Sequence, residues 1–196
     1  MVNGIILASG FSRRFGADKL MASLSEKHVL EYTIETTLKS KLETVNVVYR
    51  TPDVGVLIDQ FKGVNSVLNK NAVKGQSEAI KVGLSKIDNG GAFLFLVGDQ
   101  PFISVETINK LIRVFEEKKP DIVVSLYKGK KGNPVLFANH LKKELNLLTG
   151  DQGGRQLIRS EQWKIAYIEI DDENEGLDID RPEDLETMRQ LMKDKS

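Results

Sequence analysis

Residues 4–19 have the sequence GIILASGFSRRFGADK, and they give the first sign of the fold class. It begins with a short apolar run at residues 4–8, which predicts a buried strand, and continues into a turn rich in glycine, serine and basic residues. Similar runs, rich in β-branched residues, recur at residues 45–49, 64–68, 92–97 and 122–126. Stretches with helical apolar spacing lie between them, at residues 29–38, 54–61, 77–84 and 107–115. The alternation predicts an α/β fold: a doubly wound, mostly parallel sheet with helices on both faces.

The rhythm of strand and helix changes in the last third of the chain. A basic, glycine-bearing turn (KGKKGNP, residues 128–134) precedes a short apolar run at 135–137, and helical pieces are expected at 141–148 and 152–158. A strand at 164–170 and a closing helix at 182–192 complete the chain, and the acidic run 171–175 is interpreted as a solvated loop. This part predicts an antiparallel edge insertion. No linker or repeat divides the chain, so residues 1–196 are expected to form a single domain.

Composition excludes several classes of protein. The 28 basic and 28 acidic residues leave a formal net charge of zero, so no overall field favours nucleic acid or an anionic membrane. The chain has no cysteine and only two histidines, which excludes disulfides, zinc-thiolate sites and a cysteine nucleophile. No apolar run approaches the roughly 18 to 20 residues of a membrane span, and the N-terminus lacks the pattern of a secretory signal. A cytoplasmic protein without nucleic-acid or membrane partners is expected.

The turn after the first strand has the composition of a triphosphate site. In a parallel sheet, ligands bind beyond the carboxyl ends of the strands, which is where this turn lies. Glycines let backbone amides approach an anion, hydroxyls add donors and basic side chains add positive charge, supplied here by Ser9, Gly10, Ser12, Arg13, Arg14, Gly16 and Lys19. The Walker spacing does not fit, because five residues separate the two glycines and the lysine lies three further on. The alternative is a surface loop with solvated basic residues.

Residues 7–19, here called the signature loop, resemble the motif Leu-Ala-x-Gly-x-Ser-x-Arg-x-Gly-x-x-Lys of the nucleotidyltransferases that modify the molybdenum cofactor. The resemblance is to the MobA-like NTP transferase family, in particular its cytidylyltransferase, or MocA-like, branch, whose architecture is similar to that of nucleotide-diphospho-sugar transferases and is Rossmann-like. It implies that the loop backbone and Lys19 hold a nucleoside triphosphate, and that Lys19, Arg14 and Asp99 are catalytic. Arg14 keeps the literal Ser-x-Arg spacing, with Arg13 as the neighbouring alternative. Ser9 stands where many members have alanine or glycine, which leaves the base preference open.

Residues 68–84, LNKNAVKGQSEAIKVGL, supply a second motif. They resemble the Asn-x5-Gly-x-Ser segment of the cytidylyl branch, which lies against the base and ribose. A helix start of this kind offers free amides, and the local alternative is that Ser77 simply caps the helix. The resemblance implies that the nucleotide-binding residues are Leu7, Ala8, Ser9, Gly10, Ser12, Arg13, Lys19, Asn69, Gly75, Ser77 and Asp99.

Carboxylates in two segments are candidates for a magnesium site. Asp99 follows the apolar run FLFLV at the carboxyl end of a predicted strand, and the resembled family has its metal ligand there; the alternative is a turn before Pro101. Asp178 and Asp180 would share a face of an extended segment, and we rank Asp180 slightly ahead. The alternative for Asp180 is a helix N-cap with a capping box. Mg²⁺ is therefore the expected cofactor.

Two further elements resemble the acceptor side of the cytidylyl branch, GKKGNPVLF and LLTGDQGGRQLI. The acceptor-binding residues implied are Gly132, Asn133, Pro134, Asp151 and Arg155. Asn133 stands where histidine is frequent. Lys130 and Lys131, with Arg155, could meet a pterin phosphate, or the lysines could serve only solubility.

The resemblance covers residues 7–185 and implies transfer of CMP from CTP to the molybdopterin form of the molybdenum cofactor, with release of pyrophosphate. Such a transfer needs no protein nucleophile, which suits a chain without cysteine. Guanylyl transfer from GTP is the nearest alternative, followed by transfer to a sugar or alditol phosphate. A non-catalytic cofactor carrier or insertion chaperone is the alternative from another class. A molybdoenzyme or an insertion chaperone is the expected protein partner.

Overall fold

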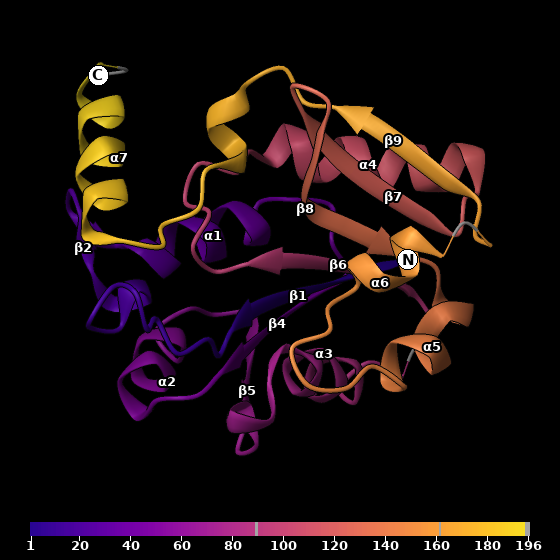
Figure 1. Cartoon of the computed structure of the whole chain (residues 1–196), viewed down its shortest axis with the longest axis horizontal. Helices are drawn as coiled ribbons and strands as arrows, with labels where there is room; N and C mark the ends of the chain where they lie inside the picture. The colour runs from indigo at the N-terminus through magenta and orange to yellow at the C-terminus, as the bar shows by residue number, and fades with distance from the viewer. Residues whose placement is uncertain (89, 161, 195–196) are drawn as a thin grey trace.

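The computed structural model describes residues 1–88, 90–160 and 162–194. Its centre is a seven-stranded sheet (Figure 1) with the strand order β5 (Val64–Leu68), β4 (Thr44–Tyr49), β1 (Val2–Ala8), β6 (Ala92–Val97), β8 (Lys130–Phe137), β7 (Ile122–Tyr127) and β9 (Ile165–Glu169). Every strand is parallel to β1 except β8, which runs antiparallel to both of its neighbours. The predicted doubly wound, mostly parallel sheet is confirmed.

The place of the antiparallel strand differs from the prediction. β8 lies inside the sheet between β6 and β7, and the edge on that side is β9, which is parallel to β7. The expected turn at 128–134 is also too long. Lys128 and Gly129 both have positive φ, 49° and 73°, and make a two-residue hairpin turn, so β8 begins at once at Lys130. Because β8 folds back directly beside β7, its other edge pairs with β6.

Helices cover both faces of the sheet. α1 (Val29–Leu38), α2 (Pro52–Ile58) and α4 (Val105–Lys118) pack on one face, and α3 (Gln76–Leu84), α5 (Lys142–Asn146) and α6 (Arg155–Arg159) pack on the other. The strand pleat divides these layers, since Ile5 of β1 joins the second cluster and its neighbour Ile6 joins the first. Burial of each such side chain stabilises the fold by about 2 kcal/mol.

Short elements complete the fold beyond the carboxyl ends of the central strands. The signature loop leads into η1 (Lys19–Met21) and a small hairpin of β2 (Ser23–Leu24) and β3 (Lys27–His28), which the sequence did not predict. The final helix, α7 (Pro182–Asp194), packs Leu185 and Met188 against Leu24 of this hairpin. The remaining 3-10 turns are η2 (Ala72–Lys74), η3 (Asn139–Leu141) and η4 (Glu173–Gly176).

The acidic run at 171–175 is not simply a solvated loop. Asp171 is exposed, but the side chain of Asp172 accepts from the amide of Asn174 and begins η4. Glu175 is only 8% exposed, and its Oε2 accepts a 3.0 Å hydrogen bond from the amide of Ser104 at the start of α4.

No described helix is long and apolar enough to cross a membrane.

Candidate functional site

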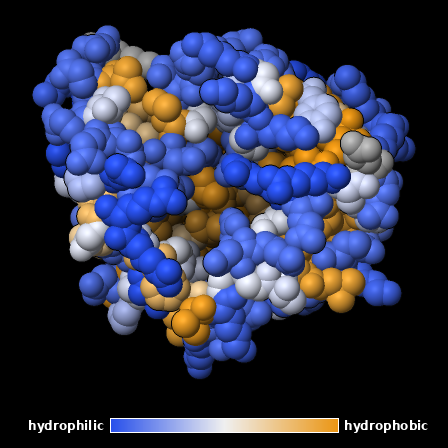
Figure 2. Space-filling model, viewed as in Figure 1, coloured by the Kyte–Doolittle hydropathy of each residue, from blue (hydrophilic) through white to orange (hydrophobic). Residues whose placement is uncertain are grey.

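The carboxyl ends of β1 and β6 open into a cavity of about 470 Å³, here called the first cavity. Figure 2 shows the molecule hollowed over the carboxyl end of β6, with hydrophilic side chains around the opening. Most of the residues that the sequence analysis assigned to a nucleotide or a metal line this cavity: Leu7, Ala8, Ser9, Gly10, Ser12, Arg13, Arg14, Lys19, Gly75, Asp99 and Asp180. The cavity therefore joins segments from both ends of the chain.

The signature loop is folded on itself around Ser12. This residue has a positive φ of 49°, and its carbonyl accepts hydrogen bonds from the amides of Phe15 and Gly16. Its hydroxyl accepts a 3.3 Å bond from the amide of Lys19. Gly10 faces open space, because a Cβ added there would meet no atom within 4 Å. Ser12 thus shapes the loop, and Gly10 leaves room for an anion close to the backbone.

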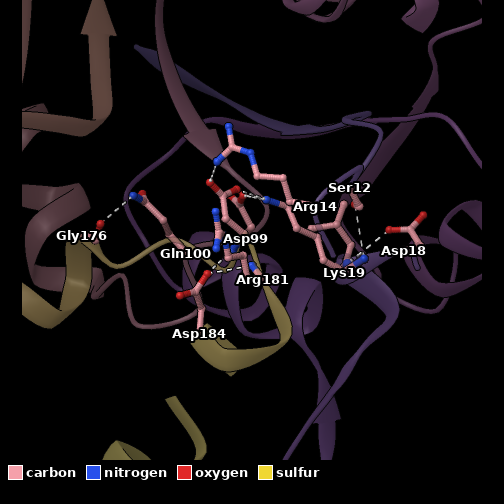
Figure 3. Close-up of polar contacts among 11 residues, drawn as sticks. Ser12, Arg14, Asp18, Lys19, Asp99, Gln100, Gly176, Arg181 and Asp184 are labelled. Atoms are coloured by element: carbon pink, nitrogen blue, oxygen red, sulfur yellow. Dashed lines mark hydrogen bonds and ion pairs between the residues drawn. The ribbon is translucent and has the colours of Figure 1, made fainter. Parts of the chain in front are cut away.

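Four charged side chains meet at the edge of the first cavity. The ammonium of Lys19 pairs with the carboxylate of Asp99 and lies 3.0 Å from Oδ1 of Asp180, while Nη1 of Arg14 lies 2.8 Å from Oδ2 of Asp180. Figure 3 shows the side chains of Arg14, Lys19 and Asp99 converging. Lys19 and Asp99 are largely buried, with 13% and 17% of their side chains exposed, so water screens this pair weakly. Of the two arginines left open by the motif, Arg14 makes this ion pair and Arg13 lies beside the ring of Phe11.

These ion pairs shift the proton affinities of both partners. Burial alone would lower the pKa of Lys19, but the Asp99 and Asp180 carboxylates outweigh it and raise the pKa above its usual range. The hydrogen bond from Lys19 lowers the pKa of Asp180, and the charge of Arg14 adds to the effect. Both groups are therefore fully charged at neutral pH.

The N-cap interpretation of Asp180 is wrong. Asp184 supplies the capping carboxylate at the start of α7, since its Oδ2 accepts from the amides of Asp180 at 2.9 Å and Arg181 at 2.7 Å. This leaves the side chain of Asp180 free to reach Lys19 and Arg14. The tail before it is fixed as well, because the amide of Ile179 donates to the carbonyl of Asp99 at 3.1 Å.

Asp178 does not line the first cavity. It is exposed and lines a separate recess with Gln100 and Tyr127. Packing of protein atoms around the carboxyl, together with the negative charge of Asp99, raises the pKa of Asp178 to about 6. Across the described residues the side chains do not form a ready group of three acidic or histidine ligands. The two carboxylates that converge on one positive charge, the ammonium of Lys19, are those of Asp99 and Asp180.

The predicted base-side segment lies partly behind the cavity wall. Asn69 and Ser77 are 2% and 0% exposed and do not line the first cavity. Asn69 donates a 3.1 Å hydrogen bond to the hydroxyl of Ser9 and so supports the loop from below. Ser77 does not cap α3: the cap is Gly75, and the Ser77 amide donates to the carbonyl of Gly150 at 3.0 Å. The helix start therefore has one free amide fewer than expected.

A second cavity adjoins the first, and a third adjoins the second. The second cavity, about 870 Å³, has an apolar part formed by Phe95, Val135 and Phe137, and it shares four residues with the first cavity: Leu7, Gln76, Asp151 and Asp180. The third cavity, about 260 Å³, is the recess beside Asp178. Asn133 and Arg155 line both the second and the third cavity, Asp151 lines the second, and Gly132, Lys130 and Lys131 line the third. Pro134 is buried and lines neither.

Tyr127 fixes the strand that carries these acceptor-side residues. Its hydroxyl donates a 2.7 Å hydrogen bond to the carbonyl of Asn133. The ring fills spaces left by two glycines, because a Cβ on Gly132 or Gly176 would come within 2.8 Å of it. Burial, with the nearby charge of Glu175, raises the pKa of Tyr127, which stays a neutral donor. Tyr127 thus joins β8 to the segment that leads into Asp178 and Asp180.

A family model described as the MobA-like NTP transferase domain matches residues 4–165, which include the signature loop, Asp99 and the acceptor-side elements. The chain belongs to this family. The domain is 32% identical to the purine catabolism protein PucB of Bacillus subtilis (strain 168), over 96% of each chain. It is 33% identical to a probable molybdenum cofactor guanylyltransferase of Natranaerobius thermophilus, over 65% of this chain and 62% of that protein. A solved structure of Rv0371C from Mycobacterium tuberculosis, in complex with manganese, has the same fold, with a TM-score of 0.81 at 21% identity over 96% of this chain and 98% of that chain.

Some residues that build the site of this MobA-like domain were missed by the sequence analysis. Phe11, Val73 and Gln76 line the first cavity, and Gln76 also lines the second together with Gln152. Phe11 is an aromatic side chain inside a polar loop, a local signal that could have marked it. The glutamines carry no such signal, because nothing in their neighbourhood along the chain indicates which way they face.

Proposed function

We propose that this domain transfers CMP from CTP to the molybdopterin form of the molybdenum cofactor and releases pyrophosphate. The observation that carries the proposal is the shared wall of the first two cavities. Asp180 lines both, and it pairs with Lys19 and Arg14 of the signature loop. A triphosphate held in the first cavity would then have its α-phosphate close to an acceptor held in the second.

The carboxylates at this junction suit a divalent ion. Asp99 and Asp180 both reach the single ammonium of Lys19, so one cation can lie within reach of both. Mg²⁺ is typically bound by one or two carboxylates, with phosphate oxygens and water completing its shell. The residues therefore fit Mg²⁺, with Asp99 and Asp180 as ligands and Asp178 as a third candidate. When bound, the ion would neutralise phosphate charge, and the manganese complex of the related Rv0371C structure supports a divalent ion.

The chain's own groups then have to orient the two substrates and neutralise the charge of their phosphates. A phosphate oxygen of the acceptor attacks the α-phosphorus, and the bond from that phosphorus to the bridging oxygen of the leaving pyrophosphate breaks. The acceptor phosphate is ionised at pH 7, so no general base is needed. Neither histidine lines any of the three cavities: the His140 imidazole lies 3.0 Å from Asp121, and His28 begins α1. The positive charges of Lys19 and Arg14 can stabilise the negative charge that develops on the phosphates in the transition state.

The choice of CTP rests on the resemblance of residues 69–77 to the cytidylyl branch. A relative named as a probable guanylyltransferase supports GTP as the second candidate. Ser9, with its hydroxyl held by Asn69, stands at the position in the loop where the motif varies. Transfer to a sugar or alditol phosphate would use the same first cavity with a different occupant of the second.

A pyrophosphate-release assay separates these functions. CTP and GTP are each supplied with Mg²⁺ and molybdopterin, and Lys19→Ala is the control with lowered activity. Release with CTP alone is the expected result, and release with GTP alone would assign the guanylyl reaction. Release with neither nucleotide, from protein that binds molybdopterin, would indicate a cofactor carrier. A sugar phosphate in place of molybdopterin tests the remaining alternative, and Mn²⁺ in place of Mg²⁺ tests the metal preference.

A further inference from the structure

Arg50 and Thr51, which follow the carboxyl end of β4, contact the signature loop that leaves the neighbouring strand β1. β1 and β4 are paired in parallel with Ala8 opposite Tyr49, so the loop leaves the sheet directly beside Arg50 and Thr51. Neither residue lines the first cavity. We therefore expect them to act on a bound nucleotide through the loop.

The guanidinium of Arg50 contacts the first part of the loop in two ways. Its Nη2 donates to the carbonyl of Gly10 at 3.4 Å, and its Cζ lies 4.6 Å from the centre of the Phe11 ring. Phe11 is 42% exposed and lines the first cavity. A planar guanidinium suits this double contact, because it can stack on a ring while donating in its own plane.

The last part of the loop is held through Asp18. Its carboxylate lies 3.9 Å from Nη2 of Arg50 and accepts a 3.2 Å hydrogen bond from the hydroxyl of Thr51. The other oxygen of Asp18 accepts from the amide of Leu20 at 3.2 Å and caps η1, which begins at Lys19. The turn that presents the Lys19 ammonium is thus tied to the end of β4.

We propose that Arg50, supported by Thr51, is a positioning residue that holds the signature loop ready for the triphosphate. This inference rests on the proposed function. A loop with two glycines loses much freedom on ordering, and contacts that order it before binding remove that cost from the binding step. Holding the Gly10 carbonyl on Arg50 also keeps an oxygen that would repel phosphate out of the first cavity.

Titration calorimetry of CTP and GTP in the presence of Mg²⁺ tests the proposal on the full chain. Arg50→Ala is expected to weaken binding of the accepted nucleotide by about 10-fold to 30-fold, and the KM for the acceptor is expected to stay within about twofold. Arg113→Ala is the matched control, since Arg113 is an exposed arginine of α4 that lies outside the signature loop and lines none of the three cavities. Thr51→Val, which removes only the hydroxyl, is expected to weaken binding by about threefold.

Arg50→Lys separates anchoring from simple attraction between charges. Lysine keeps the positive charge but has no planar group to lie over Phe11 while donating to Gly10. We expect it to recover less than half of the lost affinity on a logarithmic scale. Hydrogen exchange of the amides of residues 10–18 is expected to speed up in both Arg50 variants and not in Arg113→Ala.

Full recovery of affinity by Arg50→Lys, or an affinity within twofold of wild type in Arg50→Ala, would overturn the inference. If Arg50→Ala does not fold, the lysine variant decides: unchanged affinity and unchanged exchange overturn the inference. A wild-type chain that binds neither nucleotide overturns the proposed function together with this inference. A wild-type chain that binds, with variants that bind equally well, overturns this inference alone.

Discussion

The ammonium of Lys19 lies 3.0 Å from Oδ1 of Asp180, although 161 residues separate them along the chain. The contact joins the signature loop at one end of the protein to the tail before α7 at the other. Asp99, at the end of β6, completes the group. The first cavity therefore depends on three segments that meet only in the folded state.

Lys19→Ala is expected to lower kcat/KM for the nucleotide by about tenfold to a thousandfold, the scale of losing one preorganised charge in a transition state. The measurement is steady-state pyrophosphate release. Lys27→Ala is the control, because Lys27 also loses an ion pair, with Glu35 at 2.7 Å, but lies on the small hairpin and lines none of the cavities described above. Equal rates for Lys19→Ala and wild type would show that Lys19 has no part in the reaction.

Asp99→Asn and Asp180→Asn are each expected to weaken Mg²⁺ binding in the presence of a non-hydrolysable nucleotide by at least about tenfold, because each removes one charged ligand oxygen. Binding is followed by calorimetry, and chelation of the metal should abolish turnover of the wild type. Asp53→Asn, in the first turn of α2, serves as the control. Unaltered Mg²⁺ affinity in both site variants would contradict their role as ligands.

Asp178→Asn is expected to stabilise the metal-free protein at pH 7.5. The pKa of Asp178 in the folded protein is about 6, above the unfolded value of 3.8, so its ionisation opposes folding above pH 6 and has no effect below about pH 4. Contact with solvent screens the effect, which we put at about 1 kcal/mol or less. Thermal unfolding with chelator should show a melting point higher by about 2 °C at pH 7.5. The difference should vanish at pH 4, and the exposed Asp171→Asn should show none at either pH.

Gly75→Ala is expected to cost more than about 2 kcal/mol in the free energy of unfolding, through strain and overpacking together. Gly75 has a φ of +101°, and an added Cβ would come within 2.4 Å of the backbone of Gly150. Gly90→Ala isolates the strain, because Gly90 also has a positive φ, 70°, with no atom within 4 Å of the added Cβ. Urea unfolding of both variants measures the difference. Equal losses of unfolding free energy in the two variants would mean that the segments around Gly75 and Gly150 move apart without cost.

Tyr127→Phe is expected to raise the KM of the acceptor by about threefold to tenfold and to leave the KM of the nucleotide unchanged. The variant keeps the ring between the two glycines and removes the hydrogen bond to the Asn133 carbonyl, at a cost of about 1 kcal/mol in stability. Tyr167→Phe is the control, since Tyr167 is 46% exposed on β9. A shift in nucleotide KM instead would place the effect of Tyr127 in the first cavity.

The sequence was sufficient for the elements whose signal is local. Apolar runs marked the central strands, and the spacing of Ile108, Leu111 and Ile112 marked the buried face of α4. The full length of β8 was missed because its first residues are polar and glycine-bearing, and only pairing with β7 makes them a strand. β2 and β3 are two residues each, too short for any periodic signal.

For the candidate site, the motifs indicated which residues gather but not how they are used. Local spacing favoured Asp180 as a helix cap, and its real partners lie more than 160 residues away. Ser12 was expected to donate its hydroxyl to an anion, which stays a prediction; the acceptor role of that hydroxyl toward the Lys19 amide was not foreseen. The contacts of Arg50 with Phe11 and Asp18 could not be predicted, because they cross from one strand to the next.

The interior position of β8 ties the two halves of the protein into one unit. A chain that ended before Lys130 would lack β8 and β9, and this would leave β6 with an open edge and β7 with no partner strand in the sheet. The acceptor-side half is therefore not a module that could be removed, or exchanged with that of a relative, while the nucleotide-side half stays intact. Under the proposed function, we expect a new acceptor preference to arise by substitution on a continuous sheet.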